Sequence, residues 1–218
     1  MVKKKILIVE GNTREENSEF TAVGINTHTE SLIESINFYE KDLDISIANP
    51  SSDNNLKNSI DSLDKYDGMI WGGSSLNIYN DTDEIRRQIS FMRECQLKIK
   101  KIFAICWGLQ VAVTVAGGQV KKSEKGAHRG IAHNIKVNNI GSNHKIYLDK
   151  KRQFNSPAFN FDEVVKIPEG AILLSSNELN NVMGLNFKTN TSDIWGIQYH
   201  PEITYEKMVS LIHFRKER

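Results

Sequence analysis

The sequence is poor in cysteine and in net charge, and it has no long apolar run. Two cysteines among 218 residues exclude a disulfide-stapled scaffold and favour a reducing compartment. Lys and Arg total 28 against 27 for Asp and Glu, so no overall field would attract nucleic acid or an anionic membrane. No apolar stretch could span a bilayer, and no signal-peptide pattern is present. We therefore expect a cytoplasmic protein with no nucleic-acid or membrane partner.

The sequence also lacks any feature that would divide it or supply a cofactor. It has four prolines and no Pro-rich linker, internal repeat or low-complexity tract. With 39% hydrophobic residues it can bury one sizeable core, which predicts a single domain over residues 1–218. No glycine loop followed by lysine is present to cradle phosphates, so ATP-dependent chemistry is not expected in this chain. We expect no cofactor and no metal.

Alternating apolar runs and helical patterns define the first half of the chain. Runs typical of strands covered on both faces lie at residues 6–9, 43–50, 66–75 and 101–106. Apolar residues recur at helical spacing at 29–39, 56–64 and 85–96, whereas residues 12–28 are polar and predicted to be irregular. The alternation predicts an α/β fold with a doubly wound, mostly parallel, flavodoxin-like central sheet flanked by helices.

The second half of the chain has a different pattern of apolar residues. After Gly117 and Gly118, short β-type runs follow one another until a final helix predicted at about 204–214. They predict an added β-rich segment. In a parallel sheet the working edge lies at the strand C-termini, so the functional loops should begin at Gly11, Gly72 and Cys106.

Cys106 stands where the buried-looking run KIFAIC meets the apolar segment WGLQ. A nucleophile on a tight strand-to-helix turn is held out at the edge of the sheet. The positive potential at a helix N-terminus also stabilises a thiolate over a thiol. The alternative is a small core residue, which is what we expect Cys95 to be. Cys106 alone leaves both interpretations open, and its partners must decide between them.

His200 is a candidate partner, at the end of the predicted strand in DIWGIQYHPE. Residues two apart in extended chain project to the same side, so Glu202 can hold one imidazole nitrogen while the other faces the thiol. Together with Cys106 this gives the cysteine, histidine and acid of nucleophilic catalysis. The remaining histidines are expected to be ordinary surface or core residues: His28, His128, His133, His144 and His213.

The motifs AICWGLQ and GIQYHPE, in that order, resemble the class I glutamine amidotransferase (glutaminase) domain over essentially the whole chain. The stretch WGGSSLNIYND resembles the glycine-pair oxyanion loop of that family, in the form found in the free-standing, GMP-synthase-like subgroup. The resemblance implies Cys106 as the nucleophile, His200 as general base and acid, and Glu202 as the residue that orients His200.

The same resemblance implies further site residues. The backbone amides of Gly73 and Trp107 would bind the oxyanion. Substrate binding would involve Gln110, Gly72, Ser74 and Gly130. Two positions depart from the family pattern: Ala104 stands where glycine usually precedes the cysteine by two residues, and Asn160 stands where relatives commonly have histidine.

The activity implied is hydrolysis of a small molecule, glutamine, through a γ-glutamyl thioester, with release of ammonia and then glutamate. A separate synthetase subunit would then accept the ammonia. One alternative keeps the same three residues and changes the substrate to a γ-glutamyl amine or peptide. The other is a catalytically silent regulatory or binding module on the same fold.

Overall fold

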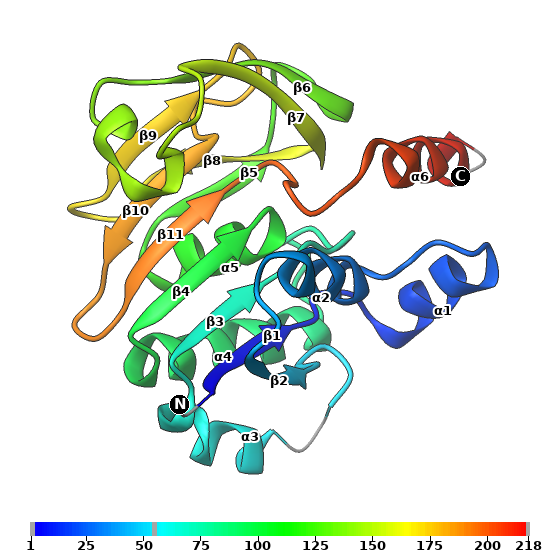
Figure 1. The fold of residues 1–218 in the computed structure, drawn as a ribbon, viewed down its shortest axis with the longest axis vertical. Helices are drawn as coiled ribbons and strands as arrows, with labels where there is room; N and C mark the ends of the chain where they lie inside the picture. Colours follow the sequence, from blue (N-terminus) through cyan, green and yellow to red (C-terminus); the bar gives the residue numbers. More distant parts are fainter. Residues whose placement is uncertain (1–2, 54–55, 217–218) are drawn as a thin grey trace.

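A computed structural model describes residues 3–53 and 56–216. Within this part of the chain the strands form a nine-stranded sheet, in the order β2-β1-β3-β4-β11-β10-β9-β6-β7, and a separate two-stranded sheet, β5-β8 (Figure 1). The strands are β1 (Lys4–Val9), β2 (Leu43–Ala48), β3 (Gly68–Trp71), β4 (Lys101–Ile105), β5 (Gln119–Lys122), β6 (His128–Val137), β7 (Gln153–Asn160), β8 (Asp162–Lys166), β9 (Ile172–Ser176), β10 (Gly184–Lys188) and β11 (Asp193–Ile197).

The large sheet is parallel in one part and antiparallel in the other. Strands β2, β1, β3, β4 and β11 run parallel, and β10, β9, β6 and β7 continue the sheet as antiparallel neighbours. The predicted α/β sheet is confirmed. The β-rich segment predicted for the second half is largely an extension of this same sheet, because β11 pairs directly with β4.

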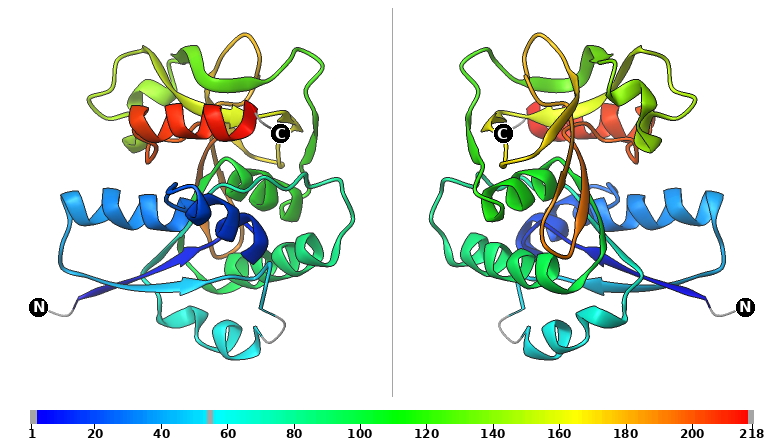
Figure 2. Two further views of the ribbon diagram at one scale, coloured as in Figure 1. Left: turned by 90° about the vertical axis from the view of Figure 1, so that its right-hand side faces the viewer. Right: turned by 90° about the vertical axis from the view of Figure 1, so that its left-hand side faces the viewer.

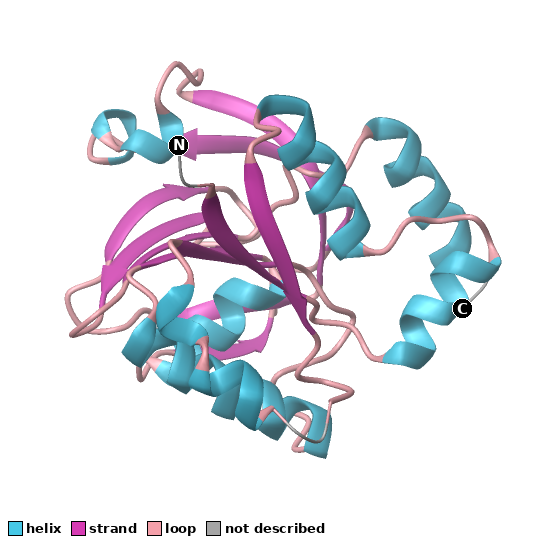
Figure 3. Ribbon diagram, turned by 60° about the horizontal axis from the view of Figure 1, so that its bottom comes forward, coloured by secondary structure: helices cyan, strands magenta, loops and turns pink. Residues whose placement is uncertain are grey.

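Helices cover both faces of the parallel strands (Figures 2 and 3). They are α1 (Arg14–Ala22), α2 (His28–Tyr39), α3 (Lys57–Asp61), α4 (Asp83–Lys98), α5 (Trp107–Val115) and α6 (Tyr205–Lys216), with short 3-10 helices η1 (Leu63–Lys65), η2 (Gly141–Asn143) and η3 (Lys145–Tyr147). One core cluster joins the sheet to α4 and α5, and a second lies on the opposite face with α2. A third, smaller cluster joins α1 and α6 beside β7. None of the described helices combines the length and apolar character needed to cross a membrane.

Continuous apolar runs explain the most deeply buried of these elements. In β1 the chain is exposed at its charged start and buried from Leu7 to Val9. Helix α5 is buried continuously from Trp107 to Val113, and it lies so close to β3 that only glycine fits at position 108: a Cβ there would lie 2.4 Å from the backbone oxygen of Trp71. The close approach brings the first turn of α5 to the sheet edge.

One prediction about the elements is wrong. Residues 12–28 are not irregular throughout, because α1 occupies Arg14–Ala22 with the Thr13 hydroxyl accepting a hydrogen bond from the Glu16 amide. Only Phe20 of this helix is buried, so its sequence carries almost no apolar periodicity.

Candidate active site

Cys106 lies on a sharp turn between β4 and α5. Its backbone has φ 52° and ψ −101°, in a region that residues with a side chain rarely adopt. The Cys106 amide donates to the backbone oxygen of Ile197 at the end of β11 (2.7 Å), which fixes the turn to the neighbouring strand. The thiol thus sits at the N-terminus of α5, where the free amides of a helix create positive potential.

Ala104, which stands where relatives usually have glycine, does not disturb this turn. Ala104 pairs with Trp71 of β3 on one side and with Gly196 of β11 on the other, in regular parallel register. It is fully buried within the core cluster that includes α5. The extra methyl group therefore fills core space beneath the turn.

His200 and Glu202 follow β11 and lie at the same edge of the sheet as Cys106, because β11 runs parallel to β4. His200 Nδ1 and Glu202 Oε1 are 2.7 Å apart, and both side chains are 2% exposed. This hydrogen bond leaves Nε2 as the nitrogen available to the thiol. Burial opposes a charge on His200, but the carboxylate of Glu202 and the sulfur of Cys106, each also hydrogen-bonded to the imidazole, together raise the pKa of His200 to about 10.

The glycine pair after β3 contacts both the first turn of α5 and His200. The Gly108 amide donates to the Gly72 carbonyl (3.2 Å), tying this loop to the first turn of α5. A Cβ on Gly73 would lie 2.7 Å from Cε1 of His200. Among the described residues, no backbone oxygen accepts from the amides of Gly73 or Trp107. Both N–H groups are thus free for a ligand oxygen.

A hydrogen-bonded chain of three residues holds the Trp107 side chain. Its indole N–H donates to Gln88 Oε1 (2.7 Å), and Gln88 Nε2 donates to the backbone oxygen of Gly11 (2.9 Å). Gly11 follows β1, and a Cβ there would lie 2.8 Å from the indole. The loops that begin at Gly11, Gly72 and Cys106 therefore meet at this edge of the sheet. Gln88 was not predicted, because a buried glutamine inside a helix gives no signal in the sequence.

A cavity of about 250 Å³ opens onto the thiol. Its lining includes Cys106, Gln110 and Ser74, which the sequence placed in the site. Gly72 and Gly130 are not among the lining residues. Gly72 lies behind the loop against Leu32, and Gly130 lies in β6, where a Cβ would contact Ile212 of α6.

Gln198 is a site residue that sequence reasoning missed. Its Nε2 donates to the Cys106 sulfur (3.3 Å), and its Oε1 lies 3.5 Å from Nε2 of Gln110. The backbone oxygen of Phe159 is 3.9 Å from the same sulfur. Gln198 stands two residues before His200, and this spacing in extended chain could have indicated that it shares the side facing Cys106.

His28 was expected to be an ordinary residue, yet its ring stacks on that of His200. The ring centroids are 5.4 Å apart and the planes differ by 21°. Burial, followed by the nearby charge of His200, lowers the pKa of His28 well below its usual value, so His28 is neutral. Nδ1 of His28 has no partner among the described residues.

His28, His200 and Glu202 also place potential metal-ligand atoms within 4.8 Å of one another. The ring geometry does not suit a metal, because imidazole lone pairs lie in the ring plane and two nearly parallel planes do not converge on one ion. We interpret His28 as packing that confines the His200 ring.

The other histidines lie outside this group. His128 and Asn160 are joined by a 2.9 Å contact between Nδ1 and Oδ1, and Nε2 of His128 lies 2.9 Å from Nδ2 of Asn177. Asn160 thus belongs to a buried polar network at the end of β7 while also lining the thiol cavity. His144 packs edge-on against Trp195, and His133 and His213 are exposed.

A larger cavity of about 590 Å³ lies between α2 and α6, behind Glu202. Its lining includes Lys207, whose ammonium donates to the Thr27 backbone oxygen (3.0 Å) and to the Ser31 hydroxyl. Burial lowers the pKa of Lys207 to about 8. This cavity does not include Cys106, so the smaller one is the candidate substrate site.

Comparison with known proteins gives consistent matches. Residues 25–216 match the family model described as glutamine amidotransferase class-I. A γ-glutamyl-L-1-hydroxyisopropylamide hydrolase of Pseudomonas sp. is 30% identical over 210 residues, which are 94% of this chain and 69% of that protein. A subunit of the glutamine-hydrolysing GMP synthase of Sulfolobus acidocaldarius is 27% identical over 147 residues, 67% of this chain and 73% of that protein. The crystal structure of a glutamine amidotransferase from Thermotoga maritima has the same fold, with a TM-score of 0.74 and 17% identity over 98% of this chain and 83% of that one.

Proposed function

The chain belongs to the class I glutamine amidotransferase family, and we propose that it hydrolyses a γ-glutamyl amide bond, that of glutamine or of a γ-glutamyl amine, through a thioester on Cys106. The observation that carries this proposal is the site itself. A strained cysteine at a helix N-terminus lies beside a buried imidazole, and a carboxylate holds the far nitrogen of that imidazole at 2.7 Å. In this arrangement the cysteine sulfur attacks carbonyl carbons, the histidine transfers protons and the acid orients the histidine.

In the first step the Cys106 thiolate attacks the γ-carbonyl carbon and a C–S bond forms. The negative charge that develops on the carbonyl oxygen would be stabilised by the amides of Gly73 and Trp107, which have no backbone acceptor of their own among the described residues. The C–N bond then breaks while His200, a cation at neutral pH, gives its proton to the departing nitrogen. The product leaves as ammonia or an amine.

In the second step water attacks the γ-glutamyl thioester. His200, now neutral, accepts a proton from the water as the oxygen bonds to the carbonyl carbon. The C–S bond breaks, glutamate leaves and the thiolate with its imidazolium partner is restored. Glu202 keeps the same contact with Nδ1 in both steps, so Nε2 handles the proton each time.

Covalent trapping tests this proposal. A glutamine-like chloromethyl ketone should label Cys106 stoichiometrically and spare Cys95, because burial raises the pKa of the Cys95 thiol and keeps it protonated. Peptide mass spectrometry reads out the site, and Cys106→Ser should abolish both labelling and hydrolysis of glutamine and of γ-glutamyl-ethylamide. Hydrolysis that survives Cys106→Ala would contradict the proposal, and a wild type that shows neither labelling nor hydrolysis would favour a binding module.

A second candidate function adds a partner. The Sulfolobus relative is named as one subunit of its enzyme, so we propose that ammonia released here can pass to a separate synthetase subunit. Glutaminase activity should then rise when a synthetase partner is added. A purified chain that stays monomeric, is fully active alone and captures no synthetase would contradict this. The free thiols of Cys95 and Cys106 are consistent with a reducing, cytoplasmic compartment, which we also propose.

A further inference from the structure

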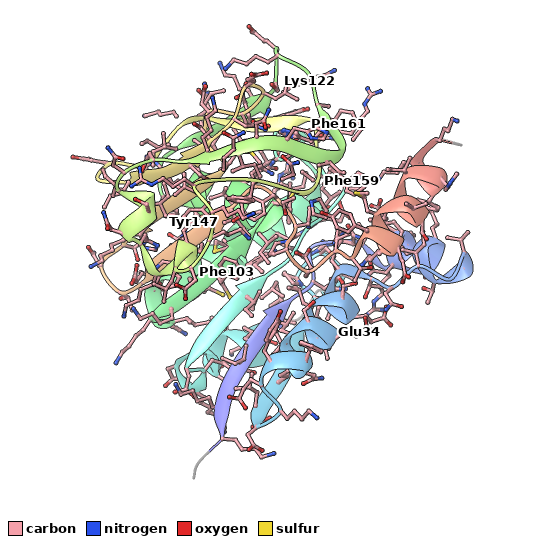
Figure 4. The ribbon with its side chains drawn as sticks, turned by 45° about the horizontal axis from the view of Figure 1, so that its top comes forward. Glu34, Phe103, Lys122, Tyr147, Phe159 and Phe161 are labelled. Atoms are coloured by element: carbon pink, nitrogen blue, oxygen red, sulfur yellow. The ribbon has the colours of Figure 1, made fainter. Side chains whose placement is uncertain are left out.

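A further cavity of about 370 Å³, called the second cavity below, adjoins the one that opens onto the thiol and is distinct from the one behind Glu202. The two share three lining residues: Phe159, Phe161 and Arg215. Phe159 comes from the end of β7 and Phe161 from the residue between β7 and β8, and both lie on the side that faces α6, which carries Arg215 (Figure 4). A ligand bound at the thiol that extends past these three side chains would therefore reach the second cavity.

The charged residues that line the second cavity are all basic. Its described lining includes Arg129, Arg215 and Lys216, and it includes no Asp or Glu. Two guanidinium groups lie over phenyl rings here, Arg215 over Phe159 (5.1 Å from carbon Cζ to the ring centroid) and Arg129 over Phe161 (5.4 Å). A cation–π contact of this kind uses none of the N–H donors of the guanidinium, which can still bind an acceptor.

Arg215 has unused hydrogen-bonding capacity. It is partly buried, and it donates one long hydrogen bond to the Ser75 hydroxyl (3.5 Å). Among the described residues it forms no ion pair within 4.0 Å. A guanidinium has five N–H donors in a planar fork, and the group that matches this fork is a carboxylate.

Glutamine itself does not need this second space, because its leaving group is ammonia. We propose that the second cavity binds the leaving-amine side of the substrate, and that Arg215, assisted by Arg129, binds a carboxylate on that amine. The substrate class is then γ-glutamyl amino acids and γ-glutamyl peptides. This inference rests on the proposed cleavage at Cys106 and adds the residues that select the leaving group.

The glutamyl half of the substrate has other polar contacts available. The lining of the thiol cavity also includes Ser74, Gln110 and Asp162, which offer donors and acceptors for an α-amino and an α-carboxylate group. Of these two cavities, Arg129 lines only the second. A carboxylate bound between Arg215 and Arg129 therefore belongs to the amine side of the scissile bond.

Two ligands of matched shape test the inference without depending on turnover. γ-Glutamyl-alanine and γ-glutamyl-isopropylamide differ only by a carboxylate in place of a methyl group. Their dissociation constants can be measured by titration calorimetry on Cys106→Ala, which cannot form the thioester. We expect the background protein to bind γ-glutamyl-alanine about tenfold or more tightly, as for a charge-assisted hydrogen bond to a partly buried group.

Variants on this background assign the preference to residues. Arg215→Gln should remove most of the preference for γ-glutamyl-alanine over γ-glutamyl-isopropylamide. Arg215→Lys should keep part of this preference, because the positive charge stays while the planar fork of N–H donors is lost. Arg129→Gln should reduce it about twofold to fivefold, as expected for an exposed charge. Arg93→Gln is the matched control: Arg93 is exposed on α4 and lines neither cavity, so the preference should be unchanged.

The results separate this inference from the proposed function. Equal affinity for the two ligands, or no binding of γ-glutamyl-alanine, overturns the leaving-group site. Equal weakening of both ligands by Arg215→Gln also overturns it, because Arg215 would then bind the glutamyl carboxylate. Labelling of Cys106 by the chloromethyl ketone is measured separately, so the cleavage chemistry can stand when the leaving-group site fails.

Discussion

Replacing Glu202 with glutamine should remove the charge on His200 at neutral pH. Burial is the largest influence on this imidazole and opposes its charge, while Glu202 and Cys106 raise its pKa to about 10. Relative to the ordinary value of 6.5, the imidazolium is favoured by about 5 kcal/mol, at about 1.4 kcal/mol per pKa unit. Glu202→Gln keeps a side-chain oxygen near Nδ1 but removes the charge, so the pKa of His200 should fall toward or below 6.5.

The assay is NMR titration of the His200 ring between about pH 5 and about pH 10, a range that spans the ordinary and the raised pKa. Loss of the imidazolium should also slow release of the leaving amine about a hundredfold or more at neutral pH, since general acid catalysis contributes that much. Because the folded-state pKa is raised, the stabilisation it provides is complete below pH 6.5 and is lost as pH rises through about 10. The free energy of unfolding should therefore fall more steeply across this window in the wild type than in Glu202→Gln.

Glu206→Gln is the control for this prediction. Glu206 is exposed at the start of α6 and the substitution is the same, but it removes no contact with His200. Its titration and rate should match the wild type. An unchanged His200 titration in Glu202→Gln would refute the reasoning, because the raised pKa would then not come from the Glu202 carboxylate.

Three further changes give distinct outcomes. Gly108→Ala should destabilise the fold by about 1–3 kcal/mol in urea unfolding, because the new Cβ would lie 2.4 Å from the Trp71 backbone oxygen, which cannot move alone; an unchanged midpoint contradicts this. Gly73→Ala should slow thioester formation about a hundredfold, because its Cβ would lie 2.7 Å from Cε1 of His200 and displace the ring; stopped-flow acylation at the wild-type rate refutes it. His28→Phe keeps a ring beside His200 and removes a buried neutral base whose pKa is lowered. As pH falls below 6.5, the unfolding free energy of His28→Phe should decrease less steeply than that of the wild type, by up to about 1.4 kcal/mol per pH unit. Equal slopes would show that His28 does not contribute to the acid sensitivity.

The elements that the sequence predicted are those whose apolar residues form a continuous run or recur at helical spacing. Strand β1 shows the first pattern and helix α2 the second, and both lie within a residue or two of their predicted positions. Helix α1 shows neither, since Phe20 is its single buried residue, and it was missed. Its stability comes from the Thr13 cap and from packing against α6, which are contacts that apolar periodicity does not record.

The site divides in the same way. Cys106, His200 and Glu202 could be selected because each stands in a short motif at the end of a strand, where local spacing already implies a geometry. His28 and Arg215 could not. They come from α2 and α6, near opposite ends of the chain, and their nearness to Cys106 and His200 arises only when both helices pack beside the sheet edge.

The antiparallel half of the sheet has a role in the site that its sequence texture did not indicate. β11 reaches the centre of the sheet only from the end of the chain, and it pairs with β4 on one side and with β10 on the other. Because β4 and β11 are parallel neighbours, the turn that follows β4 and the turn that follows β11 project from the same edge. The cysteine and the histidine thus meet through a long-range strand pairing. The β-rich segment places β11 in register, so a change that weakens the pairing of β10 with β11 should separate Cys106 from His200 without touching either residue.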